Sequence, residues 1–244
     1  MAKLSISNIS IKVKAKKIID DLSLEIKSGE IHALMGPNGA GKSSLAQILA
    51  GNDHYQITGE IILDQQNILD LKPEKRARLG LLLAFQNPVE IPGLKIELFL
   101  REAYRQRFPE REISALEFRQ KLQALAQELK IDEQLIFRNL NENFSGGEKK
   151  KLEILQLAIL EPKFLIIDEI DSGLDIDALK NIARSVRLII SRYNTGLLII
   201  THYQRLLNYL TPDFVHILSA GKIVKSGDLT LVEKLEKTGY ENLM

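Results

Sequence analysis

One short segment constrains the fold of this chain more than any other feature, because it matches the phosphate-binding loop pattern. The segment reads Gly36-Pro37-Asn38-Gly39-Ala40-Gly41-Lys42-Ser43, and Ser44 extends it. Its glycines let backbone N–H groups close around phosphate oxygens, and a following helix points its positive end at them. We expect Lys42 to reach the β- and γ-phosphates and the Ser43 hydroxyl to bind Mg²⁺. The alternative is a glycine turn with a solvated lysine. An apolar strand before the loop and a helix after it favour the phosphate site.

The hydrophobic pattern changes twice along the chain. Continuous apolar runs such as 164–167 and 197–201 alternate with helical segments, which is typical of a parallel sheet covered on both faces. From about 96 to 160 the pattern is helical, with almost no strand signal. We therefore expect one domain over 1–244, in which 1–88 and 159–244 form a nucleotide-binding α/β core. The segment 89–158 is expected to be an inserted helical subdomain.

Two local patterns make sharper predictions. Leu4 and Ile6 alternate with polar residues, whereas Ile9 and Ile11 alternate in the opposite phase, which predicts a β-bulge at Ser7-Asn8. The sequence Ser114-Ala115-Leu116-Glu117 predicts a capping box at the start of a helix.

Composition excludes several functional classes. The 244 residues include no cysteine, which excludes disulfides, a cysteine nucleophile and Cys-ligated metal sites within this chain. The net charge of +1 gives no support to nucleic-acid binding. No apolar run approaches the ~20 residues of a membrane-spanning helix. We expect a cytoplasmic protein (or a stromal one, if it belongs to a plastid) that does not insert into a membrane.

Two acids follow the apolar strand Phe164-Leu165-Ile166-Ile167. The strand would place Asp168 at the carboxyl edge of the sheet, beside the phosphate loop, where it could hold Mg²⁺ through water. Glu169 could then act as general base for an attacking water. Taken alone, two acids after a strand are more often a helix cap or a solvated turn. The phosphate loop in the same chain reverses that preference.

A second anion site is predicted at Ser145-Gly146-Gly147, where backbone N–H groups would be exposed at the start of a helix. One chain rarely needs two sites for one γ-phosphate. A head-to-tail dimer does, because each nucleotide can lie between the loop of one protomer and the second site of the other.

Six elements together resemble the ABC-type ATPase family over essentially the whole chain. They are the phosphate loop 36–43, Gln86, the signature Ser145-Gly146-Gly147, the strand and acids 164–169, Ser172-Gly173-Leu174-Asp175, and His202. The resemblance implies ATP and Mg²⁺ as ligands and a P-loop NTPase fold with a mixed sheet and an antiparallel β subdomain. It also implies that Gln86 contacts Mg²⁺ and the attacking water, that His202 contacts the γ-phosphate, and that Asp175 lies at an ATP-dependent dimer contact.

Finer details resemble the SufC family, the ATPases of the Suf iron–sulfur cluster assembly machinery. These details are Glu148 where the general signature has Gln, and the segments 85–93, 171–179, 201–205 and 221–228. This resemblance implies SufB-like and SufD-like partners, with the chain supplying ATP-driven motion. Two other functions remain open, namely the ATPase subunit of a membrane importer and a non-hydrolysing ATP-gated scaffold.

Three further expectations concern other segments. The segment 11–16 has no aromatic residue to stack on adenine, so Val13 would offer only an apolar contact. The run 149–151 is expected to be a solvated lysine face, or else one lysine pairs with the acids at 168–171. The apolar stretch 88–96 is expected to be a docking loop for partners, with packing under the helical insert as the alternative.

Overall fold

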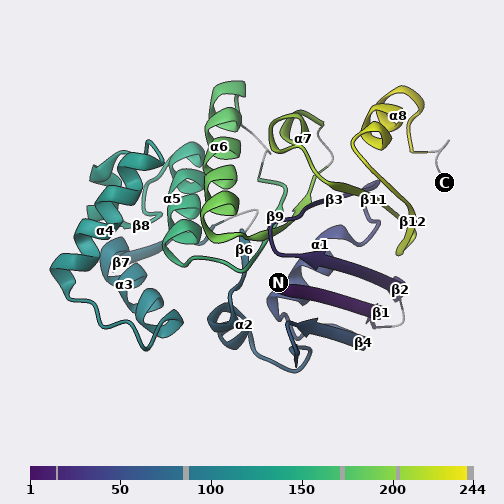
Figure 1. Cartoon of the computed structure of the whole chain (residues 1–244), viewed down its shortest axis with the longest axis horizontal. Helices are drawn as coiled ribbons and strands as arrows, with labels where there is room; N and C mark the ends of the chain where they lie inside the picture. Colours follow the sequence, from purple (N-terminus) through teal and green to yellow (C-terminus); the bar gives the residue numbers. More distant parts are fainter. Residues whose placement is uncertain (15, 85–87, 171–173, 202–203, 241–244) are drawn as a thin grey trace.

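A computed structural model describes residues 1–14, 16–84, 88–170, 174–201 and 204–240. Figure 1 shows most of the strands gathered toward one end of an elongated molecule and the helices of the middle third at the other. Long central helices lie between these two ends. The fold therefore separates a sheet-rich part from a helix-rich part, as the change in hydrophobic pattern predicts.

A six-stranded mixed sheet forms the centre of the sheet-rich part, in the order β12-β11-β3-β10-β9-β6. Four of the five neighbouring pairs are parallel, and the fifth, β12 with β11, is antiparallel. The parallel order brings the carboxyl ends of β3, β9 and β10 to one edge, where the phosphate loop begins. The six strands are β3 Ile31–Met35, β6 Leu81–Ala84, β9 Phe164–Asp168, β10 Gly196–Ile200, β11 Phe214–Ser219 and β12 Lys222–Gly227.

A second, antiparallel sheet has the order β2-β1-β4-β5. Its strands are β1 Lys3–Val13, β2 Lys16–Lys27, β4 Gln56–Leu63 and β5 Gln66–Asn67. The register of β1 against β2 shifts between Ile6 and Ile9, and Asn8 has a φ of 50°. The bulge that the change of phase predicts is therefore confirmed. Opposite it, a Cβ on Gly59 would lie 2.5 Å from the carbonyl oxygen of Asn8, so only glycine fits there.

Eight α-helices are described. Their bounds are α1 Lys42–Ala50, α2 Pro73–Leu79, α3 Ile96–Arg107, α4 Ala115–Glu128, α5 Gly146–Ile159, α6 Ile176–Tyr193, α7 Gln204–Leu210 and α8 Thr230–Thr238. The predicted capping box at the start of α4 is confirmed: the Glu117 N–H donates to Ser114 Oγ at 3.2 Å and the Ser114 N–H to Glu117 Oε2 at 2.9 Å.

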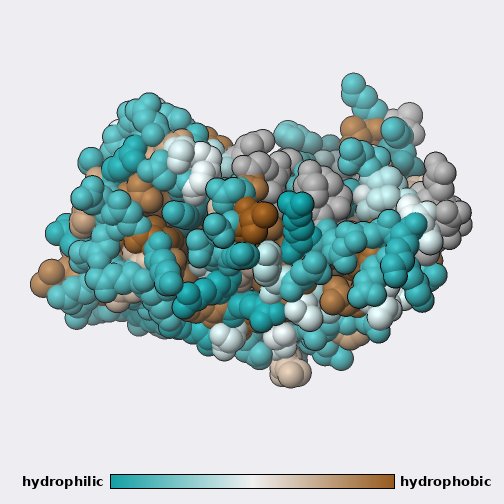
Figure 2. All heavy atoms as spheres, turned by 90° about the horizontal axis from the view of Figure 1, so that it is seen from above, coloured by the Kyte–Doolittle hydropathy of each residue, from teal (hydrophilic) through white to brown (hydrophobic). Residues whose placement is uncertain are grey.

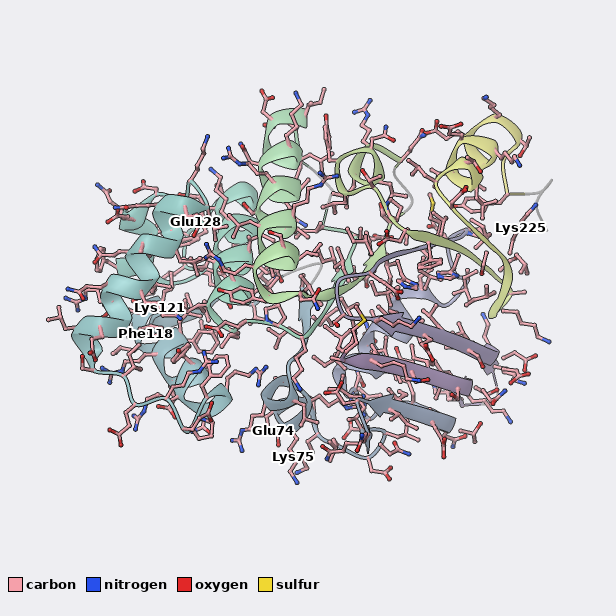
Figure 3. The ribbon with its side chains drawn as sticks, viewed as in Figure 1. Glu74, Lys75, Phe118, Lys121, Glu128 and Lys225 are labelled. Atoms are coloured by element: carbon pink, nitrogen blue, oxygen red, sulfur yellow. The ribbon has the colours of Figure 1, made fainter. Side chains whose placement is uncertain are left out.

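Helix α4 is tied to the rest of the molecule along its length. Figure 3 shows Phe118, Lys121 and Glu128 on this helix. Phe118 is fully buried in the core. Lys121 Nζ lies 3.1 Å from Glu161, just after α5, and Glu128 pairs with Arg192 near the end of α6. Burial and ion pairs together hold the helix-rich part against the two central helices.

The helical segment contains short elements that the sequence did not predict. They are β7 Ile91–Lys95, β8 Asn139–Leu140 and the 3₁₀ turn η1 Glu133–Phe137. Strand β8 has only two residues, which is too short to show the alternation of apolar and polar residues that predicts a strand. The expectation of an exposed loop over 88–96 is wrong at its end, because Ile96 begins α3 and is fully buried. Leu94 packs against the core, whereas Val89 and Ile91 are exposed.

Two histidines form a buried pair across neighbouring strands. His32 Nδ1 lies 3.1 Å from His216 Nε2, and His216 Nδ1 lies 2.8 Å from Ser226 Oγ. Both imidazole rings therefore have hydrogen-bond partners inside the protein. Burial lowers the pKa of His216 to about 4, and the neighbouring His32 lowers it further.

This pair predicts a loss of stability in acid. The folded-state pKa of His216 lies below the unfolded value, so its contribution is complete above about pH 6.5 and is lost as the pH falls toward 4. Between pH 7.5 and 5.0 we expect wild type to lose about 2 kcal/mol more unfolding free energy than His216→Asn. Urea unfolding at both pH values measures this difference. Equal losses in the two proteins would contradict it.

Candidate nucleotide-binding site

The phosphate loop joins β3 to α1 in a conformation that depends on its glycines. Gly39 and Gly41 have φ values of 79° and 107°, which side chains rarely adopt. A Cβ on Gly36 would lie 2.1 Å from the carbonyl oxygen of Leu218. A Cβ on Gly41 would lie 3.1 Å from that of Ile18. The loop is therefore packed between β11 and β2.

Lys42 is buried at the start of α1. Its ammonium group donates to the carbonyl oxygens of Gly36, at 2.8 Å, and Pro37, at 3.1 Å. Burial lowers the pKa of Lys42, and the carboxylates of Glu169 and Asp168 oppose that shift. The cation is thus folded back onto its own loop, next to the two acids.

Ser43 and Asp168 meet where α1 begins and β9 ends. The Ser43 hydroxyl donates to Asp168 Oδ1 at 3.3 Å. Burial raises the pKa of Asp168, and the nearby Glu169 charge raises it further, while the Ser43 hydrogen bond lowers it. A buried carboxylate beside a hydroxyl is a pair of hard oxygen donors, which suits Mg²⁺. The residues present therefore fit this ion.

Glu169 follows directly after β9, and its backbone has a φ of 51°. Its N–H donates to the carbonyl oxygen of Ile200 at 2.9 Å, which fixes this turn to the neighbouring strand. A non-glycine residue in the left-handed region costs energy and is often found at functional sites. The strand pattern predicts the position of the acid but gives no sign of this conformation.

The pocket around the loop is lined by Asn38, Gly39, Gly41, Lys42, Ser43, Ser44 and Glu169. Its other lining residues are Lys16, Lys17, Ile18, Ala220 and Gly221, which the sequence analysis did not predict. They come from β2 and from the turn between β11 and β12, which are joined where the Asp20 N–H donates to the Gly221 carbonyl at 2.9 Å. The described lining contains no aromatic residue. On the side formed by the start of β2, Lys16 and Lys17 line the pocket, and Val13 does not.

The signature residues lie outside this pocket. Ser145 caps α5, and Gly147 lines a separate small cavity of about 30 Å³ with residues of α5 and α6. Asp175 caps α6, where its Oδ1 accepts the Ala178 N–H at 2.7 Å. None of the three signature residues 145–147 lines the phosphate pocket in the part of the chain described. A single copy thus holds two separate groups of predicted nucleotide contacts.

Several predicted site residues lie outside the described residues: Gln86, Ser172, Gly173, His202 and the acid at 171. The lysine run 149–151 is only partly the solvated face that was expected. Lys150 is buried, and Lys149 Nζ lies 3.7 Å from Glu90. No described helix is long and apolar enough to cross a membrane.

Known proteins resemble this chain over its full length. A probable ABC transporter ATP-binding protein of Streptococcus pyogenes serotype M18 is 50% identical over 245 residues, covering 100% of this chain and 95% of that protein. A probable ATP-dependent transporter, ycf16, of Cyanophora paradoxa is 47% identical over 98% of this chain and 93% of its own length.

Solved structures agree. A structure of the ATP-binding subunit of an ABC transporter has a TM-score of 0.80 at 26% identity, covering 98% of this chain and 97% of its own. A dimeric cassette bound to ADP and Pi has a TM-score of 0.79 at 20% identity, covering 94% and 99%, and shows the same fold. Residues 19–172 match the sequence profile of the ABC transporter family. The chain therefore belongs to the ABC transporter ATP-binding family and is an ABC-type ATPase.

Proposed function

We propose that this chain hydrolyses MgATP at a site shared between two copies, and that it does so within a Suf-type complex for iron–sulfur cluster assembly. One observation carries the shared site. The phosphate pocket contains the loop, Lys42 and Glu169, but Ser145 to Gly147 lie away from it. Two copies arranged head to tail would bring each signature onto the nucleotide of the other.

An exposed apolar residue lies beside the expected dimer contact at Asp175. Ile176, next to Asp175 at the start of α6, is 53% exposed. Figure 2 shows an apolar group near the middle of the face seen from above, with polar side chains beside it. A contact between two copies at this place would remove the Ile176 side chain from water.

The proposed chemistry assigns a role to each residue. Lys42 would turn from the Gly36 and Pro37 carbonyls to the β- and γ-phosphates. Ser43 and Asp168 would hold Mg²⁺, which neutralises charge on the phosphate oxygens. Glu169 would accept a proton from the attacking water. By family resemblance, Gln86 would contact Mg²⁺ and this water, and His202 the γ-phosphate.

The Suf assignment is supported by sequence details, namely Glu148 in the signature and the segments 171–179 and 221–228. It implies SufB-like and SufD-like partners. The names of the relatives, probable ABC transporter ATP-binding protein and probable ATP-dependent transporter, describe transporters, so the ATPase subunit of a membrane importer is the alternative. The two functions use the same ATPase core and differ in the partner.

Copurification from the native cell tests the partner directly. We expect tagged chain to retain SufB-like and SufD-like proteins, and to lose them on Ile91→Glu while ATP still binds. Ile91 is 40% exposed beside the segment that follows Gln86, and a charge there would oppose burial in a contact. Val224→Glu is a matched control, because Val224 is 44% exposed on β12.

Each outcome separates the candidate functions. Retention of a membrane permease in place of these proteins would establish the importer. Equal retention by the two variants would rule out the segment around Ile91 as the docking site. A phosphate-release assay tests the scaffold, because a non-hydrolysing protein would bind ATP without releasing phosphate.

A further inference from the structure

Arg138 contacts three parts of the segment that leads into the signature. It follows η1, and its carbonyl oxygen accepts the Ile96 N–H at 3.1 Å, so α3 fixes its backbone. Its guanidinium donates to the carbonyl oxygens of Glu142 and Asn143, both at 3.2 Å. It also stacks 4.2 Å from the centre of the Phe144 ring. One side chain therefore holds the whole turn before Ser145.

The same guanidinium reaches the signature helix through Glu148. Arg138 Nη1 lies 3.4 Å from Glu148 Oε1. The other carboxylate oxygen, Oε2, accepts the Ser145 hydroxyl at 2.7 Å and the Ser145 N–H at 2.8 Å. In a single copy, the Ser145 hydroxyl proton is therefore committed to Glu148.

This arrangement conflicts with anion binding unless the carboxylate is neutralised. The hydrogen bonds from Ser145 lower the pKa of Glu148, so it is ionised at neutral pH. A carboxylate one turn from a phosphate site would repel the phosphate. A glutamine at this position would carry no such charge, whereas here the guanidinium of Arg138 is the cation beside the carboxylate.

We propose that Arg138 is a positioning residue of the signature, which neutralises Glu148 so that Ser145 can donate its hydroxyl to the γ-phosphate bound by a second copy. On dimer formation Ser145 exchanges its acceptor from Glu148 Oε2 to a phosphate oxygen, and Glu148 keeps Arg138 as its partner. The guanidinium meanwhile holds the preceding turn through the Glu142 and Asn143 carbonyls. This inference rests on the proposed shared site.

The ion pair between Arg138 and Glu148 itself contributes little to folding. The side chains of Arg138 and Glu148 are 39% and 34% exposed, and exposed ion pairs contribute little to folding. Glu148→Gln keeps an oxygen to accept the Ser145 N–H, so the helix cap survives. Arg119 is a matched control, because it is an exposed arginine of the same part of the fold and pairs with Glu97 at 3.0 Å.

ATP-driven dimerisation is measured by sedimentation in a Glu169→Gln background, which slows hydrolysis. We expect Arg138→Gln to weaken the dimer by about tenfold or more, as an uncompensated charge near the phosphates requires. Adding Glu148→Gln to the same chain should restore the dimer to within about threefold, and Arg119→Gln should leave it unchanged. ATP binding by single copies should be equal in all variants, since the phosphate loop is untouched.

Two results would overturn the inference while leaving the shared site intact: an Arg138→Gln dimer as tight as the Arg119→Gln control, or no recovery on adding Glu148→Gln. Recovery is decisive because a merely structural role for Arg138 would not be rescued by removing a second charge. Failure of the parent Glu169→Gln protein to dimerise with ATP would instead contradict the proposed function, and the inference with it.

Discussion

Glu169→Gln is expected to lose most ATP turnover while keeping its affinity for ATP. The amide has nearly the same shape as the carboxylate but cannot accept the proton of the attacking water, and general-base catalysis contributes roughly 10²- to 10⁴-fold. The turn itself should survive, because the Glu169 N–H bond to Ile200 involves only backbone atoms. Phosphate release in single-turnover and steady-state assays measures the loss.

The same variant should accumulate an ATP-bound dimer, because the step that separates the two copies is blocked. Glu74→Gln is a suitable control, since Glu74 is an exposed acid on α2, away from the pocket (Figure 3). Wild-type turnover in Glu169→Gln would move the base to another residue, with the acid at 171 or His202 as the remaining candidates.

Lys42→Ala is expected to fail at an earlier step, the binding of ATP. Charge-assisted hydrogen bonds contribute about 1.5–3 kcal/mol each, so losing those to the phosphates should weaken ATP affinity by about 10²-fold. The substitution also removes the ammonium group that donates hydrogen bonds to the Gly36 and Pro37 carbonyl oxygens. Equilibrium binding of a fluorescent ATP analogue measures the change, and no ATP-driven dimer should form.

Lys75→Ala provides the matched control, because Lys75 is an exposed lysine on α2 (Figure 3). Equal affinity in Lys42→Ala and this control would show that the backbone of the loop alone holds the phosphates.

Local sequence patterns predicted those structural features that depend on residues adjacent in the chain. The phosphate loop, the bulge at Asn8 and the capping box at Ser114 each follow from a few adjacent positions, and the structure has all three loops or turns where the sequence places them. The acids at 168 and 169 were predicted to lie beside the loop because parallel strands end at a common edge, and Ser43 contacts Asp168 there.

What the sequence did not predict depends on contacts between distant segments. Lys16 and Lys17 reach the pocket only because β2 packs against the phosphate loop. In the sequence, nothing distinguishes Arg138 from an ordinary surface residue. Its position beside Glu148 depends on η1 and α3. The sequence also gives no sign of the left-handed backbone at Glu169, because glutamate rarely adopts that conformation.

The central claim, that each ATP site is shared between two copies, is tested most directly by mixing two inactive variants. Lys42→Ala has a defective loop and an intact signature. Gly147→Asp has an intact loop and a signature that repels phosphate. The aspartate fits without strain, because nothing lies within 4 Å of a Cβ at Gly147, and acids in the first turn suit a helix.

Each variant alone should be nearly inactive. A mixed dimer contains one intact site, built from the loop of the Gly147→Asp copy and the signature of the Lys42→Ala copy. An equal mixture should therefore regain about a quarter of the wild-type ATPase rate per subunit if pairing is random, and up to about half if only mixed dimers form. A mixture no more active than its separate components, with mixed dimers shown to form, would contradict the shared site.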